Sequence, residues 1–125
     1  MSGPRSVSHI RVRFAETDKF GAAYHGAYFA WFEVGRTDWL RERGMTYVDM
    51  MSRDLHLPVI STEAKFLRPV AYDDRIEITT TLGEVTGVRL RFEYELRREC
   101  ETEYLTRAHT EIASVDCSGR PRRFP

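Results

Sequence analysis

Apolar and charged side chains alternate through residues 88–98, which is the most regular pattern in the chain. The apolar positions are Leu90, Phe92, Tyr94 and Leu96, and the charged positions are Arg89, Arg91, Glu93 and Glu95. Successive side chains of a β-strand point to opposite faces of its sheet. The pattern therefore predicts a strand with a buried apolar face and a solvent-exposed charged face.

Four other segments are typical of strands in composition: residues 7–14, 59–67, 75–85 and 104–117. In the first of them, the side chains expected to face inward are Val7, Ile10, Val12 and Phe14. Thr86 and Gly87 separate two of the strand segments and predict a tight hairpin turn.

A long apolar helix is predicted over residues 26–43. Apolar residues recur there at helical spacing, at Tyr28, Trp31, Phe32, Gly35 and Trp39. Their neighbours widen the apolar surface around most of the helix, so we expect other elements to wrap it. A glycine follows at position 44, where it can adopt the left-handed conformation that ends many helices.

The expected order of elements is one strand, one long helix, a short helical turn near residues 47–51, and four antiparallel strands. This order predicts an α+β fold in which a curved sheet of about five strands wraps around the central helix. At 125 residues, the chain fits a single domain, residues 1–125.

Composition and residue spacing argue against several classes of function. The formal net charge is zero and basic and acidic residues are spread along the chain, so nothing indicates a nucleic-acid-binding surface. No segment resembles a signal peptide or is apolar for long enough to insert into a membrane, so we expect a cytoplasmic protein. We expect Cys100 and Cys117 to be reduced thiols. The four histidines have no metal-ligand spacing, so neither a metal nor a redox cofactor is implied.

The loop between the first strand and the helix holds the most promising chemistry. Asp18 lies in this loop, and His25 lies close to the expected start of the helix. A carboxylate can act as a base or nucleophile, while free N–H groups at a helix N-terminus can stabilise an oxyanion. The alternative for Asp18 is structural, as an Asx-turn residue or a helix cap.

This stretch resembles the hotdog-fold acyl-CoA thioesterases, in the branch that contains 4-hydroxybenzoyl-CoA thioesterase and the Tol-Pal-associated thioesterases. The matching residues are Glu16, Thr17, Asp18, Gly21, Tyr24, His25, Tyr28, Trp31, Phe32 and Glu33. The likeness extends to the basic C-terminal segment and covers nearly the whole chain. One position departs from the family pattern: Ala27 stands where the family usually has Asn, so a polar contact at the helix start is missing or has moved.

The resemblance implies a hotdog domain that hydrolyses an acyl-CoA thioester to a carboxylic acid and free CoA, with no cofactor besides the CoA of the substrate. Asp18 would attack the thioester carbonyl or activate a water, and both routes stay open. At His25 we favour the backbone N–H as oxyanion donor, although its side chain could polarise the carbonyl or protonate the thiolate. Hotdog domains pair edge to edge, so we expect at least a homodimer, with a homotetramer as the larger alternative.

Further residues are candidates for substrate binding: Gly21, Tyr24, Tyr28, Glu33, Phe66, Arg89, Arg91 and Arg122. The glycine suits a loop that approaches the substrate closely, and the aromatic residues suit an acyl pocket. The arginines could pair with CoA phosphates. Glu33 is a reserve catalytic carboxylate, and its structural alternative is a partly buried side chain paired with Arg36 or Arg41.

Three other functions remain alternatives. One is a thioesterase that acts on acyl chains borne by a carrier protein, and another is a hotdog hydratase. The third is a protein that binds acyl thioesters without hydrolysing them, which the missing Asn at Ala27 keeps open. Release of free thiol would identify a thioesterase, whereas a 3-hydroxyacyl thioester would identify a hydratase.

Overall fold

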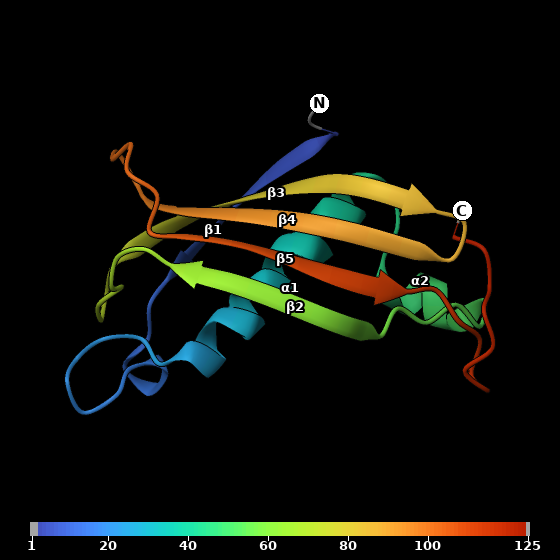
Figure 1. Ribbon diagram of the computed structural model, residues 1–125, viewed down its shortest axis with the longest axis horizontal. Helices are drawn as coiled ribbons and strands as arrows, with labels where there is room; N and C mark the ends of the chain where they lie inside the picture. The colour runs from blue at the N-terminus through green and yellow to red at the C-terminus, as the bar shows by residue number, and fades with distance from the viewer. Residues whose placement is uncertain (1–2, 125) are drawn as a thin grey trace.

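A five-stranded antiparallel sheet covers one side of a long helix in the computed structural model, which describes residues 3–124 (Figure 1). The elements in chain order are β1 (Arg5–Arg11), the 3-10 helix η1 (Phe14–Glu16), α1 (His25–Glu42), α2 (Tyr47–Ser52), β2 (Val59–Phe66), β3 (Arg75–Thr86), β4 (Arg89–Arg98) and β5 (Thr106–Ala113). The strand order in the sheet is β1-β3-β4-β5-β2, which leaves β1 and β2 as edges. This confirms the predicted α+β arrangement.

The core lies between α1 and the inner face of the sheet. Phe32 stacks on Tyr94 with ring centroids 4.7 Å apart, and Trp39 meets Phe92 edge to face at 5.3 Å. The predicted alternation in β4 is confirmed, since its four apolar side chains are at most 1% exposed. Burial of such aromatic side chains stabilises a fold by about 1.5–3 kcal/mol each.

The sheet covers one side of α1, so in the single chain the apolar surface predicted around most of the helix is only partly enclosed. Phe29 and Val34 remain 47% and 36% exposed on the opposite side. Neither α1 nor α2, the helices within residues 3–124, is long and apolar enough to cross a membrane.

The first strand differs from its prediction. It spans Arg5–Arg11, and its inward positions include Ser6 and Ser8, while Val7 is 49% exposed. Strand geometry explains the error, because successive side chains point to opposite faces. The face that holds Ile10 therefore also holds Ser6 and Ser8, and Val7 lies on the other face. Phe14 belongs to η1 and is 77% exposed.

The last strand is shorter than predicted, because β5 ends at Ala113. The chain turns just beyond it, where Val115 forms isolated bridges with both His56 and Pro121. The short helix predicted near residues 47–51 is confirmed as α2.

Gly35 lets α1 approach β3 closely, and this contact is testable. A methyl group at Gly35 would press into the Thr80 hydroxyl and lie 3.2 Å from the Ile78 side chain. We therefore expect Gly35→Ala to lower the free energy of unfolding by about 1–3 kcal/mol, despite the better helix propensity of alanine. Chemical denaturation of Gly35→Ala in wild-type and Thr80→Ala backgrounds checks this. An equal loss in both backgrounds would contradict the proposed clash.

Candidate active site

Asp18 and His25 line the same pocket, which has a volume of about 320 Å³ and lies at the end of the sheet where α1 begins. Asp18 comes from the loop after η1, and His25 is the first residue of α1. Tyr28 and residues 22–23 and 66–69 form the remaining walls. The structure therefore brings together the two residues to which the sequence assigned chemistry.

Backbone contacts hold the loop that carries Asp18. The Asp18 N–H donates to the Ala22 carbonyl at 2.8 Å, and the Ala23 N–H donates to the Val70 carbonyl at 2.7 Å. Gly21 has a φ of +84°, so this turn requires the left-handed region that favours glycine. The loop is thus tied to the segment that enters β3.

The Asp18 carboxylate has one oxygen engaged. Its Oδ1 accepts a hydrogen bond from the Phe20 N–H at 2.8 Å, which is the Asx-turn contact considered from the sequence. Its other oxygen has no partner among residues 3–124. Asp18 also lines the pocket, so the residue that shapes the loop borders the cavity.

The N-terminus of α1 has no cap from a side chain. Tyr24 is the N-cap residue, with extended backbone, and its side chain accepts no hydrogen bond. Within residues 3–124, the N–H groups of His25 and Gly26 have no acceptor. These donors and the positive end of the helix dipole are available to an anionic oxygen.

Aromatic rings form one wall of the pocket. The His25 ring stacks on Phe66, with centroids 4.1 Å apart and planes within 2°, and Tyr28 meets Phe66 edge to face at 4.8 Å. Burial raises the pKa of Tyr28 above its ordinary value of 10.0, so its hydroxyl stays protonated at neutral pH. The wall presents flat apolar surface with few ionised groups.

Glu16 is a buried carboxylate beside this site, and sequence reasoning assigned it no role. Its Oε2 accepts a hydrogen bond from the Trp31 indole N–H at 2.8 Å, and its Oε1 accepts one from the Arg13 backbone N–H at 2.8 Å. Burial alone would raise the pKa of Glu16, but the hydrogen bonds from Arg13 and Trp31 outweigh burial and lower it. Glu16 is therefore ionised at neutral pH.

Two predicted site residues on or beside α1 do not line the pocket. Tyr24 is 46% exposed at the N-cap position. Glu33 is exposed eight residues further along α1 than His25, a rise of about 12 Å. It makes no ion pair within residues 3–124, because Arg36 is buried and Arg41 pairs with Asp38. The structural alternative, a partly buried Glu33 paired with Arg36 or Arg41, is therefore not seen within residues 3–124 of the single chain.

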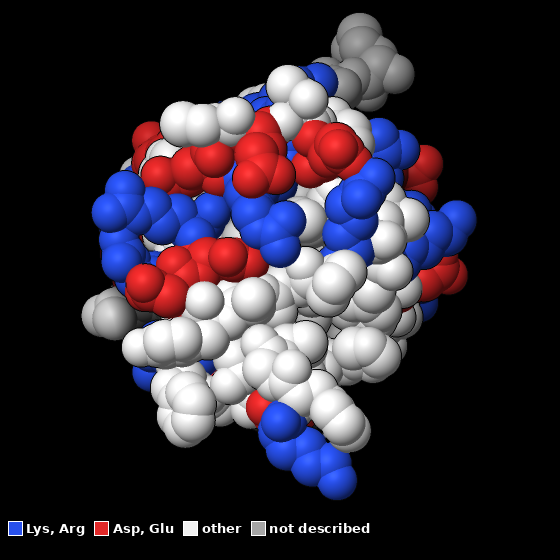
Figure 2. All heavy atoms as spheres, turned by 90° about the vertical axis from the view of Figure 1, so that its left-hand side faces the viewer, with Lys and Arg blue, Asp and Glu red and all other residues white. Residues whose placement is uncertain are grey.

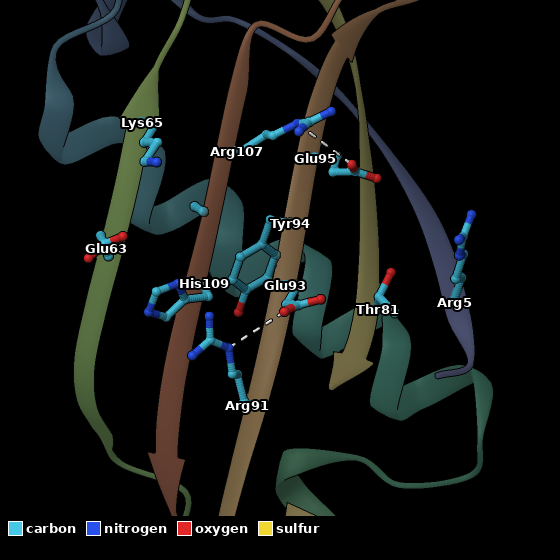
Figure 3. Close-up of a pocket in the computed structure, with 11 residues that line it drawn as sticks. Arg5, Glu63, Lys65, Thr81, Arg91, Glu93, Tyr94, Glu95, Arg107 and His109 are labelled. Carbon is cyan, nitrogen blue, oxygen red and sulfur yellow. Dashed lines mark ion pairs between the residues drawn. The ribbon is translucent and has the colours of Figure 1, made fainter. Parts of the chain in front are cut away.

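Arg89 and Arg91 lie on the outer face of β4, away from the pocket. Both approach Glu111 of β5, at 4.0 and 3.8 Å. Arg91 also lines a hollow of about 380 Å³ on this face, where ion pairs join it to Glu93 and join Arg107 to Glu95 (Figure 3). In the single chain, the structure therefore does not support these arginines as ligands of a CoA bound near Asp18.

Arg122 lies at the opposite end of the sheet from the pocket. Its guanidinium donates to the Asp54 carbonyl at 3.4 Å, and its N–H donates to the Ser114 carbonyl just beyond β5. Figure 1 shows the C-terminal segment and α2 at one end of the molecule and the loop of residues 17–24 at the other. Arg122 therefore cannot reach the pocket of its own chain.

The end of the molecule that carries the pocket is unevenly charged. Charged side chains form a band across its upper part in Figure 2, and the lower part is mostly uncharged. Exposed apolar side chains at this end include Phe14, Phe20, Phe66, Leu67 and Tyr72. Within residues 3–124, no group of three or more histidine, cysteine or acidic side chains is placed to hold a metal, and both cysteines are exposed free thiols.

Comparison with known proteins gives the family. The model of the thioesterase superfamily matches residues 20–105. The chain belongs to the thioesterase superfamily. Acyl-CoA thioesterase YbgC of Haemophilus influenzae is 31% identical over 118 residues, which cover 93% of this chain and 85% of that protein. YneP of Bacillus subtilis is 32% identical over 91 residues, which span 73% of this chain and 66% of YneP.

Solved structures agree with the family. A DHNA-CoA thioesterase from Staphylococcus aureus superposes with a TM-score of 0.90 at 31% identity, over 95% of this chain and 80% of that one. A 4-hydroxybenzoyl-CoA thioesterase superposes with a TM-score of 0.88 at 18% identity, which shows the fold alone. The predictions of a hotdog fold and of a thioesterase are thus confirmed.

Proposed function

We propose that this thioesterase hydrolyses acyl-CoA, with Asp18 as base or nucleophile and the N–H groups at the start of α1 as the oxyanion site. The observation that carries the proposal is that Asp18 and the uncapped N-terminus of α1 border one pocket. The YbgC relative supports the substrate class, since its name describes an acyl-CoA thioesterase.

In the first route, Asp18 accepts a proton from a water as the water oxygen attacks the thioester carbonyl carbon. The carbonyl oxygen becomes an oxyanion facing the N–H groups of His25 and Gly26, which are each worth on the order of 3 kcal/mol if they act as in other oxyanion sites. The C–S bond then breaks, the carboxylic acid forms and CoA leaves as a thiolate that takes up a proton.

In the second route, the Asp18 carboxylate itself attacks the carbonyl carbon. The C–S bond breaks as CoA thiolate leaves, and a mixed anhydride joins the acyl group to Asp18. Water then hydrolyses the anhydride and regenerates the carboxylate. The Asx-turn leaves one carboxylate oxygen without a partner, which supports either route.

We propose a homodimer formed through β2, the exposed edge of the sheet. Its eight residues are almost all exposed, and Val59 and Ile60 are 43% and 45% exposed. An unpaired edge with apolar side chains favours pairing with another strand. A two-fold axis would pair β2 with its copy in antiparallel fashion, so that Val59 of the partner subunit approaches Phe66.

This pairing gives the C-terminal arginines a place at the site. The C-terminal segment lies beside the Val59 end of the sheet, because Arg122 bonds to Ser114 and β5 residue Ile112 pairs with Val59. Arg122 of the partner subunit would therefore approach the pocket and could bind a CoA phosphate. Assembly of two such dimers into a tetramer, and a cytoplasmic location, remain predictions from the sequence.

Replacement of Asp18 tests the reaction. We expect Asp18→Asn to lower kcat/KM for acyl-CoA hydrolysis by about 10²-fold or more, because the amide cannot act as base or nucleophile but can still accept the Phe20 hydrogen bond. Thiol release, measured with a chromogenic reagent over short, long and aromatic acyl-CoAs, checks this.

Asp38→Asn is the control, because Asp38 pairs with Arg41 on α1, about 20 Å further along the helix than His25. Wild-type rates in Asp18→Asn would remove Asp18 from the chemistry. No thiol release from any acyl-CoA by the wild-type protein would refute the proposed function and leave the carrier-protein enzyme, the hydratase and the binder.

The role of His25 is tested separately. We expect His25→Ala to keep kcat within about tenfold of wild type, because the backbone N–H is retained and alanine is compatible with helical backbone. KM should rise, since the stack on Phe66 is lost. A loss in kcat of about 10²-fold or more would instead show that the imidazole polarises the carbonyl or protonates the leaving thiolate.

The dimer edge is tested by a charge. We expect Ile60→Lys to convert the protein from a dimer to a 14.6 kDa monomer, because a lysine on an edge strand opposes pairing. Val85→Lys is the control, since Val85 is 44% exposed on β3, away from this edge. Light scattering after size exclusion checks the masses. A monomeric wild type, or a dimeric Ile60→Lys, would contradict the proposed edge.

A further inference from the structure

We infer that Glu16 is a positioning residue for Asp18: its buried carboxylate joins the catalytic loop to Trp31 of α1 and so fixes Asp18 relative to the N-terminus of the helix. The inference rests on the role proposed above for Asp18. Glu16 would not contact the substrate.

Glu16 is buried, with 7% of the residue and 9% of its side chain exposed, and both its carboxylate oxygens accept hydrogen bonds. One oxygen accepts the Trp31 indole N–H and the other accepts the Arg13 backbone N–H, each at 2.8 Å. The Arg13 guanidinium adds a longer contact of 3.4 Å. Hydrogen bonds to an ionised group are stronger than those between neutral groups, so this contact is a firm link between η1 and α1.

The backbone of Glu16 makes a second link to α1. Its carbonyl accepts the N–H of Tyr24, the N-cap residue, at 3.2 Å. Thr17 and Ala23 then form a bridge directly above this contact. Glu16 thus closes the base of the loop in which Asp18 stands, two residues further along the chain.

Residues 22–23 tie the far side of the loop to residues 70–71, but the tip of the loop beside Asp18 is open to solvent. Lys19 and Gly21 are exposed, and Phe20 is 83% exposed. Since a misplacement of about 1 Å can lower a catalytic rate by about 10²-fold, the anchor at the base of the loop should matter for the rate. A purely structural role for Glu16 would change stability without changing kcat in the folded protein.

Two substitutions break the link from opposite sides. Glu16→Gln keeps the shape of the side chain but offers one oxygen to two N–H donors, so one donor would face the amide NH₂. Trp31→Phe keeps an aromatic ring but removes the indole N–H. We expect each to lower kcat for acyl-CoA hydrolysis by about tenfold or more, with KM changed by less than about threefold. The double variant should be no slower than the slower single variant, because both remove the same contact.

Matched controls lie at the other end of α1. Trp39→Phe removes an indole N–H that donates to the Pro4 carbonyl at 2.9 Å, and Glu42→Gln alters a carboxylate that accepts from Ser6 Oγ at 2.9 Å. Both should keep kcat within about twofold of wild type. Rates are compared at a temperature at which thermal melting shows every variant to be folded.

Amide hydrogen exchange gives a readout that does not need activity. Exchange at Asp18 and Tyr24, whose N–H groups bond to Ala22 and Glu16, should be about tenfold or more faster in Glu16→Gln and Trp31→Phe, and unchanged in the controls. Unchanged exchange and kcat in Glu16→Gln and Trp31→Phe, or an equal fall of kcat in the controls, would overturn the inference. If wild type releases no thiol from any acyl-CoA, the proposed function fails, and exchange alone decides whether Glu16 positions the loop.

Discussion

Burial of the aromatic side of α1 against the sheet is the contact on which the rest of the structure depends. Phe32 and Trp39 meet Tyr94 and Phe92 of β4, and Gly35 permits the backbone to approach β3. These contacts fix the direction of the helix, and the direction decides at which end of the sheet its free N–H groups emerge. Core packing therefore places the N–H groups proposed as oxyanion donors, and only the position of Asp18 depends on the loop.

The fold could be predicted from sequence where a regular pattern of residue types matched the burial of each face. In β4 one face is buried and the other is in solvent, so period-two alternation located the strand and its faces. In β1 the inward positions hold Ser6 and Ser8, and polarity then misidentified the faces. Arg36 shows the same limit on α1, because a charged residue is buried on the side that packs on the sheet. Residue type alone therefore does not predict burial at positions where tertiary contacts cover a polar side chain.

The candidate site was predictable to the extent that its parts are close in sequence. Asp18 and His25 flank one loop, so a strand–loop–helix prediction already placed them together. The contact between Glu16 and Trp31 joins residues 15 positions apart through side chains, and no periodicity signals it. Arg89 and Arg91 were placed at the site by charge alone. Their strand register puts Arg89 opposite Ala113 and Arg91 opposite Glu111, and no pattern in the sequence relates these positions to the pocket.

The Asx-turn of Asp18 and its proposed chemistry are compatible because a carboxylate has two oxygens. The hydrogen bond from Phe20 holds one of them and restricts rotation of the side chain, which leaves the other directed by the loop. A base or nucleophile gains from such restriction, since less orientational freedom is lost on reaching the transition state. The same logic applies to the helix start: an N-cap side chain would have satisfied the N–H groups that an oxyanion needs, and Tyr24 provides none. The site thus combines a restrained carboxylate with unsatisfied donors, and each gives up some local stability for the geometry of the reaction.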